Sequence, residues 1–446
     1  MSLDLYLREY ERARREAPGG PPWLARVRDE AIGQFQALGF PTTKDEEWRF
    51  TSVKPIADGA FTLADCNGAR RPAVGMPAIE VAGPFGAELV FVNGRYAADL
   101  SSWSPSIPAG VVIAPLSEVL SNGADVLERH LTRYAPFRQQ PFTALNTALF
   151  ADGAVIRIPA HARITAPMHV RFVCADDAGE PMMHPRVLVV MGEDSQCALV
   201  ESYGGPDGLR YFTNAVTEVV AGESAVLDHY KLQHEGVDGY HVASMHVVAA
   251  RHANVTSHSI GFGGGLVRND VTAVLDGEGA ECTLNGLYIA DRARLVDNHT
   301  TIDHARPHCA SREIYKGILA DRARAVFNGK IVVRPDAQKT DARQTNRALL
   351  LSDDARINTK PQLEIFANDV KCTHGAAIGQ LDEDAVFYLR SRGLGALEAR
   401  HLLIRAFASD VLTRMPLEPL RQAAERALLR QLERAVKSTT PSVISA

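Results

Sequence analysis

The sequence is poor in cysteine, and its cysteines show no pairing pattern. There are six of them in 446 residues, and no two form a Cys-x-x-Cys pair. Disulfide-stabilised small domains and zinc ribbons need closely spaced cysteines, so both classes are excluded. We therefore expect reduced thiols at Cys66, Cys174, Cys197, Cys282, Cys309 and Cys372.

Long apolar runs, a targeting segment and an excess of basic charge are also missing. No run approaches the roughly 18 to 20 apolar residues of a membrane-spanning helix. The N-terminal residues mix acidic and basic side chains, which fits neither a secretory signal nor a transit peptide. Lys and Arg number 48 against 53 Asp and Glu, a formal charge of -5, so no global field favours nucleic acid or an anionic membrane. These absences predict a cytoplasmic protein that binds neither nucleic acid nor a membrane.

Motifs for nucleotide binding and catalysis are absent as well. The glycine-rich run at 261–265 lacks the Lys-Ser/Thr of a P-loop and does not fit a dinucleotide-binding fingerprint. We predict a turn or a close backbone approach there. The chain has no Gly-x-Ser-x-Gly motif, and paired carboxylates cannot be assigned to a cleft from sequence. The sequence therefore carries no signature of an enzyme, and none of an ATPase.

The composition is that of a folded globular protein, with 46% hydrophobic and 23% charged residues. Helical periodicity covers the first fifty residues, with a Gly-Gly-Pro-Pro break at 19–22. Strand-like alternation begins near residue 87, and from about 150 to 370 short β-rich segments alternate with small polar turns. No helical stretch in that region is long enough for βαβ units, so a doubly wound fold is disfavoured.

The turns of this β-rich region resemble one another. Each contains a small residue followed within two positions by an apolar one, and most recur at intervals of about 27 to 32 residues. A recurring unit of this length is typical of a stacked-repeat fold, so we predict a β-solenoid, with a large β-sandwich as the alternative. The predicted corners are Ala154, Ser195, Ala225, Ala253, Ala280, Ala293, Ala323 and Ala355.

Helical periodicity returns after residue 379. Asp382 is a candidate N-cap for a first helix, and Gly393 is a candidate end for it. A second helix carries an apolar stripe, and a third is predicted at 417–436. The stripe can either pack on the end of the solenoid or remain as a docking face for a partner. It consists of Ala399, Leu402, Leu403, Ala406 and Phe407.

Two groups of residues are candidates for metal or cluster ligation. The densest contains Asp297, His299, Asp303, His304, His308 and Cys309. It lacks zinc-binding spacing, so we expect these side chains mainly on the surface or in turns. The second group is Cys372 with His374. In a strand they share a face and can bind a soft metal or a sulfur species together, and nearby Lys371 would favour the thiolate. A packed cysteine beside a turn histidine is the alternative.

Seven segments of the chain together resemble the SufB/SufD family of iron–sulfur cluster assembly scaffolds, and more closely its SufD branch. They are EEWR at 46–49, SREIYKG at 311–317, VFNGK at 326–330, AQKTDA at 337–342, KPQLEI at 360–365, KCTHGA at 371–376 and FYLRSRG at 387–393. The SufB branch typically has a His-Glu-Ala-Thr-type sequence where this chain has Cys-Thr-His-Gly-Ala.

The resemblance implies a mainly β fold, with a right-handed parallel β-helix core at 86–376. N-terminal helices and a linker at 1–85 and C-terminal helices at 377–446 would flank this core. It also implies a non-catalytic scaffold in complex with SufB and the ABC-type ATPase SufC, which docks on the C-terminal helices. We expect Leu402, Leu403, Ala406 and Phe407 to form that docking site.

The same resemblance implies a transient iron–sulfur cluster at the SufB–SufD interface. Cys372 and His374 match positions at that interface, and His374 is the preferred ligand. A reduced flavin is associated with such complexes, but no residue here assigns it to this chain. A homodimer remains an alternative assembly.

Two other functions stay open from the sequence. One is a β-helix carbohydrate lyase or hydrolase, and the other is a SufB-like scaffold acting without SufD. The carbohydrate enzyme would need secretion and an acidic or aromatic groove, whereas aromatic residues make up only 7% of this chain.

Overall fold

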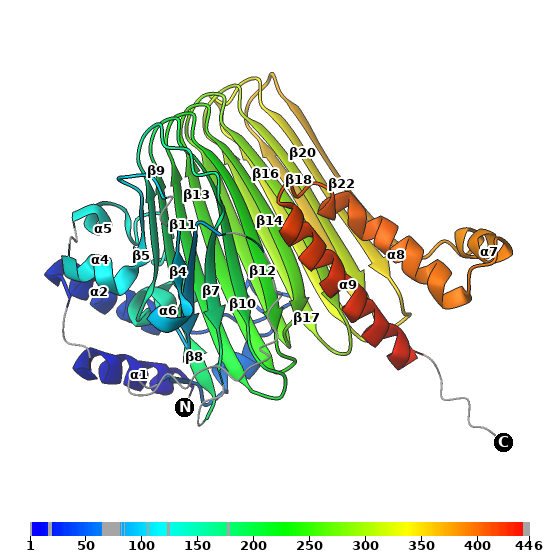
Figure 1. The fold of residues 1–446 in the computed structure, drawn as a ribbon, viewed down its shortest axis with the longest axis horizontal. Coiled ribbons are helices and arrows are strands. Elements are labelled where there is room, and N and C mark those ends of the chain that lie inside the picture. The colour runs from blue at the N-terminus through cyan, green and yellow to red at the C-terminus, as the bar shows by residue number, and fades with distance from the viewer. Residues whose placement is uncertain are drawn as a thin grey trace.

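A computed structural model describes residues 2–16, 20–64, 81, 83, 85–104, 107–122, 125–175 and 179–439 of the chain. The described residues form a parallel β-solenoid of about eight turns, with helices before and after it in the chain (Figure 1). The prediction of a β-solenoid is therefore confirmed, and the sandwich alternative is wrong. Among the described residues, no helix is both long and apolar enough to cross a membrane.

The solenoid consists of two sheets, and successive strands from β9 onward alternate between them. Pairing within each sheet is parallel, except at the N-terminal edge, where β3 and β4 pair with β2, and β5 pairs with β6, in antiparallel fashion. The first sheet contains β5 (Val112–Pro115), β6 (Gly153–Ile158), β9 (Arg186–Met191), β11 (Tyr211–Ala221), β13 (Gly239–Ala249), β15 (Leu266–Leu275), β17 (Leu295–His304), β19 (Arg324–Val333) and β21 (Arg356–Ile365), with β1 (Thr62–Leu63) and β8 (Pro181–Met183) beside this path.

The second sheet ends at β22, the last strand of the chain. It contains β3 (Arg95–Tyr96), β2 (Ala87–Val92), β7 (Met168–Val173), β10 (Gln196–Gly204), β12 (Val226–Glu235), β14 (Asn254–Gly263), β16 (Glu281–Ala290), β18 (Ala310–Leu319), β20 (Asp341–Leu350) and β22 (Lys371–Gln380), with β4 (Ser102–Trp103) beside β2. Apolar side chains from the inner faces of both sheets fill the interior, and polar groups are buried among them.

The tight corners that lead into the second sheet share one design. A residue with positive φ, such as Asp194, Ser224 or His252, is followed by a small buried residue and then by the strand. Stacked coils lie only about 4.8 Å apart, so a side chain at this point must be small. Ser195, Ala225, Ala253 and Ala280 are buried at these corners, as predicted. Ala323 and Ala355 are likewise buried at predicted corners, but these lead into β19 and β21 of the first sheet.

Two predicted corners are wrong in detail. Ala154 lies inside β6, and Ala293 is exposed while the following Arg294 is buried. The glycine-rich run behaves as expected. Gly263 has φ 88°, and a Cβ there would lie 2.2 Å from the carbonyl oxygen of Glu235 on the preceding coil. This close backbone approach explains the glycine.

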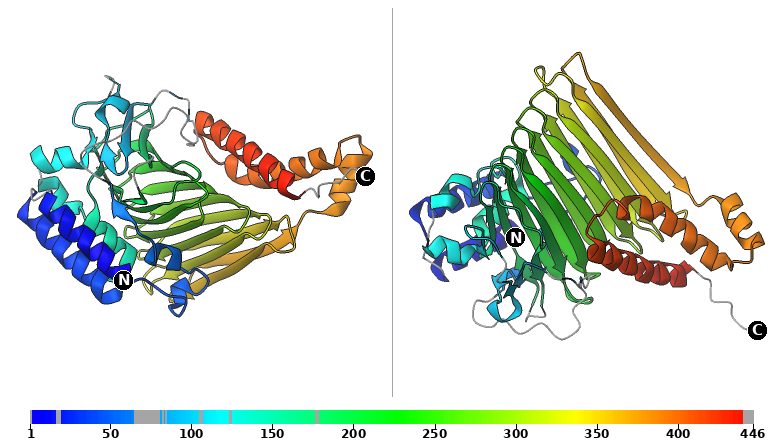
Figure 2. Two further views of the ribbon diagram at one scale, coloured as in Figure 1. Left: turned by 90° about the horizontal axis from the view of Figure 1, so that it is seen from below. Right: turned by 45° about the horizontal axis from the view of Figure 1, so that its top comes forward.

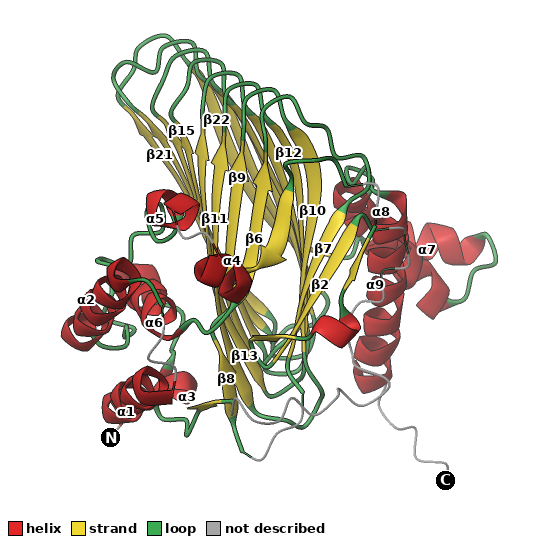
Figure 3. Cartoon of the chain, turned by 60° about the vertical axis from the view of Figure 1, so that its left-hand side comes forward, coloured by secondary structure: helices red, strands yellow, loops and turns green. Residues whose placement is uncertain are grey.

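Helices cover the outer faces of both sheets (Figure 3). The N-terminal helices pack with aromatic side chains against the first sheet, where Phe35, Phe142 and Phe212 are buried in one cluster. They comprise α1 (Ser2–Glu16), α2 (Pro22–Leu38), α3 (Lys54–Ala57), α4 (Leu116–Asn122), α5 (Asp125–His130) and α6 (Pro141–Leu149), together with the 3-10 turns at Glu46–Trp48 and Ala98–Leu100. Because α4 to α6 fall inside 86–376, the predicted β-helix range also contains helices.

The C-terminal helices α7 (Glu383–Ser391), α8 (Ala396–Leu412) and α9 (Glu418–Thr439) lie on the other flank (Figure 2). The Asp382 carboxylate accepts hydrogen bonds from the backbone N–H groups of Asp384 and Ala385, which confirms the predicted cap. α8 and α9 bury Ile404, Leu420 and their apolar neighbours against the outer face of the second sheet. α7 projects away from the solenoid (Figure 1).

The EEWR segment at 46–49 fastens the N-terminal part of the chain to the first sheet. Arg268 lies 4.1 Å from the centroid of the Trp48 ring and donates a hydrogen bond to the backbone oxygen of Glu47. The Glu47 carboxylate lies 3.2 Å from His299 Nδ1 on β17. These contacts join segments more than 200 residues apart in sequence, which local periodicity cannot reveal.

Candidate functional site

The C-terminal end of the second sheet is an open edge. β22 pairs with β20 along its whole length, and among the described strands none pairs with its other side. Cys372 is partly buried, and every other residue of β22 is exposed. The end of the first sheet adds exposed Ile365, and Phe366 follows it. This end of the solenoid therefore exposes both polar and apolar side chains, together with backbone groups of β22 that pair with no other described strand.

Cys372 and His374 lie together on β22, as predicted. In the parallel register they adjoin Ala342 and Gln344 of β20, both of which are buried inside the coil. Residues two apart on a strand point to the same side, so both predicted ligands belong to the inner face of the last coil. His374 is exposed, so its imidazole is available to a ligand from outside.

A buried polar row continues behind His374. Gln344 donates a hydrogen bond of 2.8 Å from Nε2 to the Glu313 carboxylate on the next coil inward. Burial raises the pKa of Glu313 to about 7. The exposed imidazole thus stands in line with a buried carboxyl group that can take up or release a proton near neutral pH.

The environment of Cys372 contradicts one expectation. Burial raises the pKa of its thiol, and the Asp341 carboxylate adds to that effect. The idea that Lys371 would favour the thiolate is therefore wrong, because desolvation and the nearby negative charge oppose ionisation. Cys372 can ligate a metal only if the metal displaces its proton.

The group of histidines and acids around Asp297 is not a surface cluster. Asp297, His304 and Cys309 are buried, because stacked coils cover them, and His299 and Asp303 are partly buried. His308 is exposed in a turn, as expected. Asp297 accepts hydrogen bonds from Arg268 and Thr51 and pairs with His299 at 3.0 Å. Burial by itself would lower the pKa of His299, but the charge and the hydrogen bond of Asp297 have the larger effect together and raise this pKa to about 9. In the described part of the chain, no group of three or more His, Cys, Asp or Glu side chains is arranged to hold a metal.

The predicted docking stripe on α8 divides into two sides. Leu402 and Ala406 are exposed, whereas Leu403 and Phe407 are partly buried, and Phe407 packs beside the second sheet. Lys316 of β18 reaches the Phe407 ring at 4.5 Å and pairs with Asp410 at 2.9 Å. The buried residues of α8 are Ala399, Ile404, Ala408, Val411 and Leu412, so Ala399 of the predicted stripe is not available to a partner.

The most exposed apolar surface of the C-terminal helices lies on α7, which sequence reasoning missed. Phe387 is 71% and Tyr388 57% exposed, and Leu397 and Leu402 on α8 are also exposed. The sequence did contain a signal for this surface. Phe387 and Tyr388 are adjacent aromatic residues on a short helix, and neither of them reaches the core. An exposed apolar surface of this kind is typical of a protein–protein contact.

A second group of titratable residues lies inside the coils. Glu201 contacts His229, and Lys231 donates a hydrogen bond to Asn269. Burial lowers the pKa of Lys231 to about 8. The cavity beside these groups measures about 20 Å³, which is room for a water molecule and not for a substrate. We therefore read this network as interior structure.

Comparisons with known proteins agree with this architecture. The family model described as "SUF system FeS cluster assembly, SufBD core domain" matches residues 172–407, and "SufBD protein N-terminal region" matches residues 3–170. An iron–sulfur cluster assembly SufBD family protein of Synechocystis is 34% identical over 413 residues, covering 89% of this chain and 88% of that protein. The iron–sulfur cluster assembly protein SufD of Escherichia coli is 30% identical over 395 residues, covering 88% and 89% respectively.

Proposed function

The chain belongs to the SufBD family of iron–sulfur cluster assembly proteins and is SufD-like, and from this premise we propose that it is a scaffold subunit and not an enzyme. It would pair with a SufB-type chain, bind the ATPase SufC, and help to hold a nascent cluster at the interface between the two solenoids. ATP hydrolysis would reside in SufC.

The observation that carries the pairing is the open edge of β22. Alternate residues along its ten-residue length present backbone groups that pair with no other described strand, and natural proteins normally cover or interrupt an edge of this length. A strand from another chain can satisfy these groups by extending the sheet. The exposed side chains of Ile365, Phe366 and Ile378 supply apolar area at the same end. A second solenoid of the same family fits this surface, and a homodimer through the same edge is the alternative assembly.

The cluster is the cargo of this interface. His374 offers an exposed imidazole, and Cys372 a thiol that loses its proton on binding. Two ligands do not complete an iron–sulfur site, so the partner chain would contribute the others. An imidazole ligand carries no negative charge, and a cluster held partly by imidazole would be released more readily than one held by thiolates alone. We place any reduced flavin with the assembled complex and assign it to no residue of this chain.

Reconstitution of the complex tests the cluster site. His374→Ala should lower cluster formation on the assembled complex, measured as bound iron and sulfide, while partner binding stays unchanged. Cys372→Ala should have an equal or smaller effect. Thr373→Ala is the matched control, because Thr373 points to the other face of the same strand. Full cluster formation by the double variant in an intact complex would contradict the proposal.

We place the SufC contact on the exposed side of α7 and α8. Phe387, Tyr388 and Leu402 supply its apolar area, and Arg390 with Arg392 its charge. The paired substitution Phe387→Ala and Tyr388→Ala should weaken SufC binding at least about tenfold, since exposed aromatic residues commonly dominate an interface. Leu38→Ala on α2 is the control, because Leu38 is also an exposed apolar residue and lies on the opposite flank. Unchanged SufC affinity in the paired variant would move the contact elsewhere.

We expect this work to take place in a reducing compartment such as the cytoplasm. Cys197, Cys282, Cys309 and Cys372 are free thiols, and the first three of them are buried, which fits a compartment that keeps cysteines reduced.

A further inference from the structure

The outer face of the second sheet carries adjacent cations where it approaches the open edge. Strands β18, β20 and β22 lie side by side there (Figure 1). On β20 every second residue from 342 to 348 is buried, so Arg343 and Arg347 belong to the outer face. In the parallel register they lie next to Arg312 and Lys316 of β18. Like charges next to each other on neighbouring strands destabilise a sheet unless other groups neutralise them.

Carboxylates neutralise the two cations of β18 but not those of β20. The ion pairs of β18 measure 2.6 and 2.9 Å, and they are Arg312 with Asp341 and Lys316 with Asp410. Arg343 lies 3.7 Å from the same Asp341, and its side chain is 64% exposed. Arg347 is exposed and has no ion pair or side-chain hydrogen bond with any described residue. The two arginines of β20 therefore lack a carboxylate of their own.

β22 separates these arginines from the open edge and provides no carboxylate. Its outward residues are adjacent to those of β20, with Thr373 next to Arg343 and Ala377 next to Arg347. Between and beyond them lie Gly375 and Gly379, where an added Cβ would have no atom within 4 Å. A strand that extended the sheet past β22 would lie about 9.6 Å from β20, twice the strand spacing. Arginine and glutamate side chains that point toward each other span this distance over the small residues of β22.

A second copy of this chain does not supply the missing carboxylates. The outward row of its own β22 begins with Lys371 and continues with uncharged residues. Two such edges would bring cations toward cations, which is unfavourable across neighbouring strands. The formal charge of the whole chain is -5, so the basic surface is a local feature of this end. The strand that fits it is acidic and belongs to a different chain.

We propose that the strand added to β22 comes from a different chain and carries two carboxylates, four residues apart, that pair with Arg343 and Arg347. The spacing follows from the arginines, which are four residues apart on one face, because neighbouring strands rise equally per residue. This inference rests on the proposed pairing through β22 and adds the chemistry of the partner strand. Neither arginine belongs to the cluster ligands or to the SufC contact.

A salt series with the full-length chain tests the charge pairing. Affinity for a SufB-type chain of the same organism is measured by calorimetry in about 0.05 M and about 1 M salt. The double variant with Arg343→Gln and Arg347→Gln should bind about tenfold more weakly than wild type in low salt. The difference should vanish near 1 M, where the Debye length is only about 3 Å. The control pairs Arg26→Gln on α2 with Arg157→Gln on β6, because both arginines are exposed and the change in charge is the same.

Two substitutions of Thr373 separate charge from size. Thr373→Gln and Thr373→Glu add side chains of equal size next to Arg343. The carboxylate of Thr373→Glu neutralises Arg343 and repels an acidic strand, so this variant should bind about tenfold more weakly than Thr373→Gln in low salt. Thermal unfolding of each variant shows that the fold is retained. Iron and sulfide bound at saturating partner should match wild type in the double arginine variant, because His374 is unchanged.

The outcomes distinguish this inference from the pairing on which it rests. Unchanged affinity in the double arginine variant, while wild type binds the SufB-type chain, would overturn the acidic strand and leave the pairing intact. Equal affinities of Thr373→Glu and Thr373→Gln would do the same. Failure of wild type to bind would overturn both. If the double arginine variant lost self-association and kept its affinity for the SufB-type chain, the arginines would belong to a contact with a second copy, and the proposal would be wrong.

Discussion

Removal of the Glu218 carboxylate should destabilise the protein more than the loss of any surface charge. Glu218 and Arg186 are both fully buried, and Arg186 Nη2 lies 2.5 Å from Glu218 Oε2. The same carboxylate accepts hydrogen bonds from the backbone N–H groups of Thr132, Tyr134 and Ala135. Glu218 therefore pairs a buried cation of the first sheet and also holds the loop between α5 and α6.

The magnitude follows from what Glu218→Ala leaves behind. Arg186 would keep hydrogen bonds to Asn146 and Thr147 but would lose the carboxylate of Glu218, which is the acidic group that pairs with it among the described residues. Breaking a buried ion pair by removing one partner costs about 3 to 5 kcal/mol. With an unfolding entropy of about 2.1 cal/mol/K per residue, a chain of this length would lose about 3 to 5 °C in melting temperature.

Calorimetry measures this loss, and hydrogen exchange locates it. The amides of the loop at 131–137 should exchange faster in Glu218→Ala, because three of them lose their acceptor. Burial opposes the ionisation of Glu218, but Arg186 and the backbone N–H groups hold its pKa below the ordinary 4.5. Its contribution is therefore present above about pH 4.5 and lost at lower pH, so the deficit of the variant should shrink in acid.

Glu223→Ala is the matched control, because Glu223 pairs with Arg251 at an exposed corner of the same region. It should leave the melting temperature unchanged. If Glu218→Ala melted within a degree or so of Glu223→Ala, or if the loop amides kept their protection, the assignment of a structural role to this buried pair would be wrong.

Three further outcomes follow from the burial and charge of single residues. Asp297 and Glu47 raise the pKa of His299 from 6.5 to about 9 against the effect of burial. The contribution of His299 to stability is therefore complete below about pH 6.5 and lost toward pH 9. In a pH series of melting temperatures, the difference between wild type and His299→Gln should shrink over that interval, and a constant difference would contradict this. Ile404→Ala on the buried side of α8 should cost about 2 to 5 kcal/mol and speed proteolysis of the C-terminal helices, whereas Leu402→Ala on the exposed side should change stability by no more than about 0.5 kcal/mol. Among the five described cysteines, iodoacetamide should modify Cys372 first, because it is the partly exposed one and burial raises the pKa of Cys197 and Cys282 to about 12; equal labelling of Cys282, read by mass spectrometry, would refute the burial argument.

Repetition made the architecture readable from the sequence. A coil corner that must fit between neighbours about 4.8 Å away admits only small side chains, and this constraint returns with every coil, as at Ala225, Ala253 and Ala280. The cap at Asp382 was likewise visible, since a capping carboxylate acts on amides two and three residues ahead. The pairing of Cys372 with His374 on one face follows from the two-residue period of a strand.

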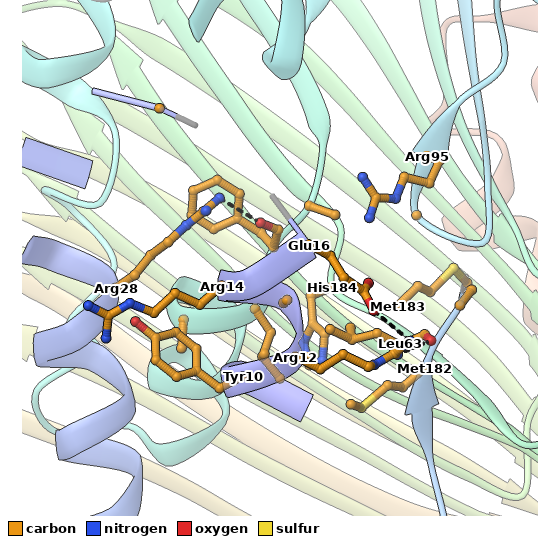
Figure 4. Close-up of a pocket in the computed structure, with 18 of the residues that line it drawn as sticks. Tyr10, Arg12, Arg14, Glu16, Arg28, Leu63, Arg95, Met182, Met183 and His184 are labelled. Atoms are coloured by element: carbon orange, nitrogen blue, oxygen red, sulfur yellow. Dashed lines mark hydrogen bonds and ion pairs between the residues drawn. The ribbon is translucent and has the colours of Figure 1, made fainter. Parts of the chain in front are cut away.

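Burial and long-range contact were decided only by the tertiary structure. Asp297 and His304 were expected at the surface or in turns, but the stacking of coils encloses them, and stacking is not visible in local spacing. Sequence spacing could not tell which side of α8 faces the second sheet, so Ile404 and Leu402 were not distinguished. One cavity is lined by Arg28, Arg95 and His184, which are far apart in the sequence (Figure 4). Local sequence patterns determine secondary structure because their interactions span a few residues, whereas these sites depend on contacts that only the folded chain creates.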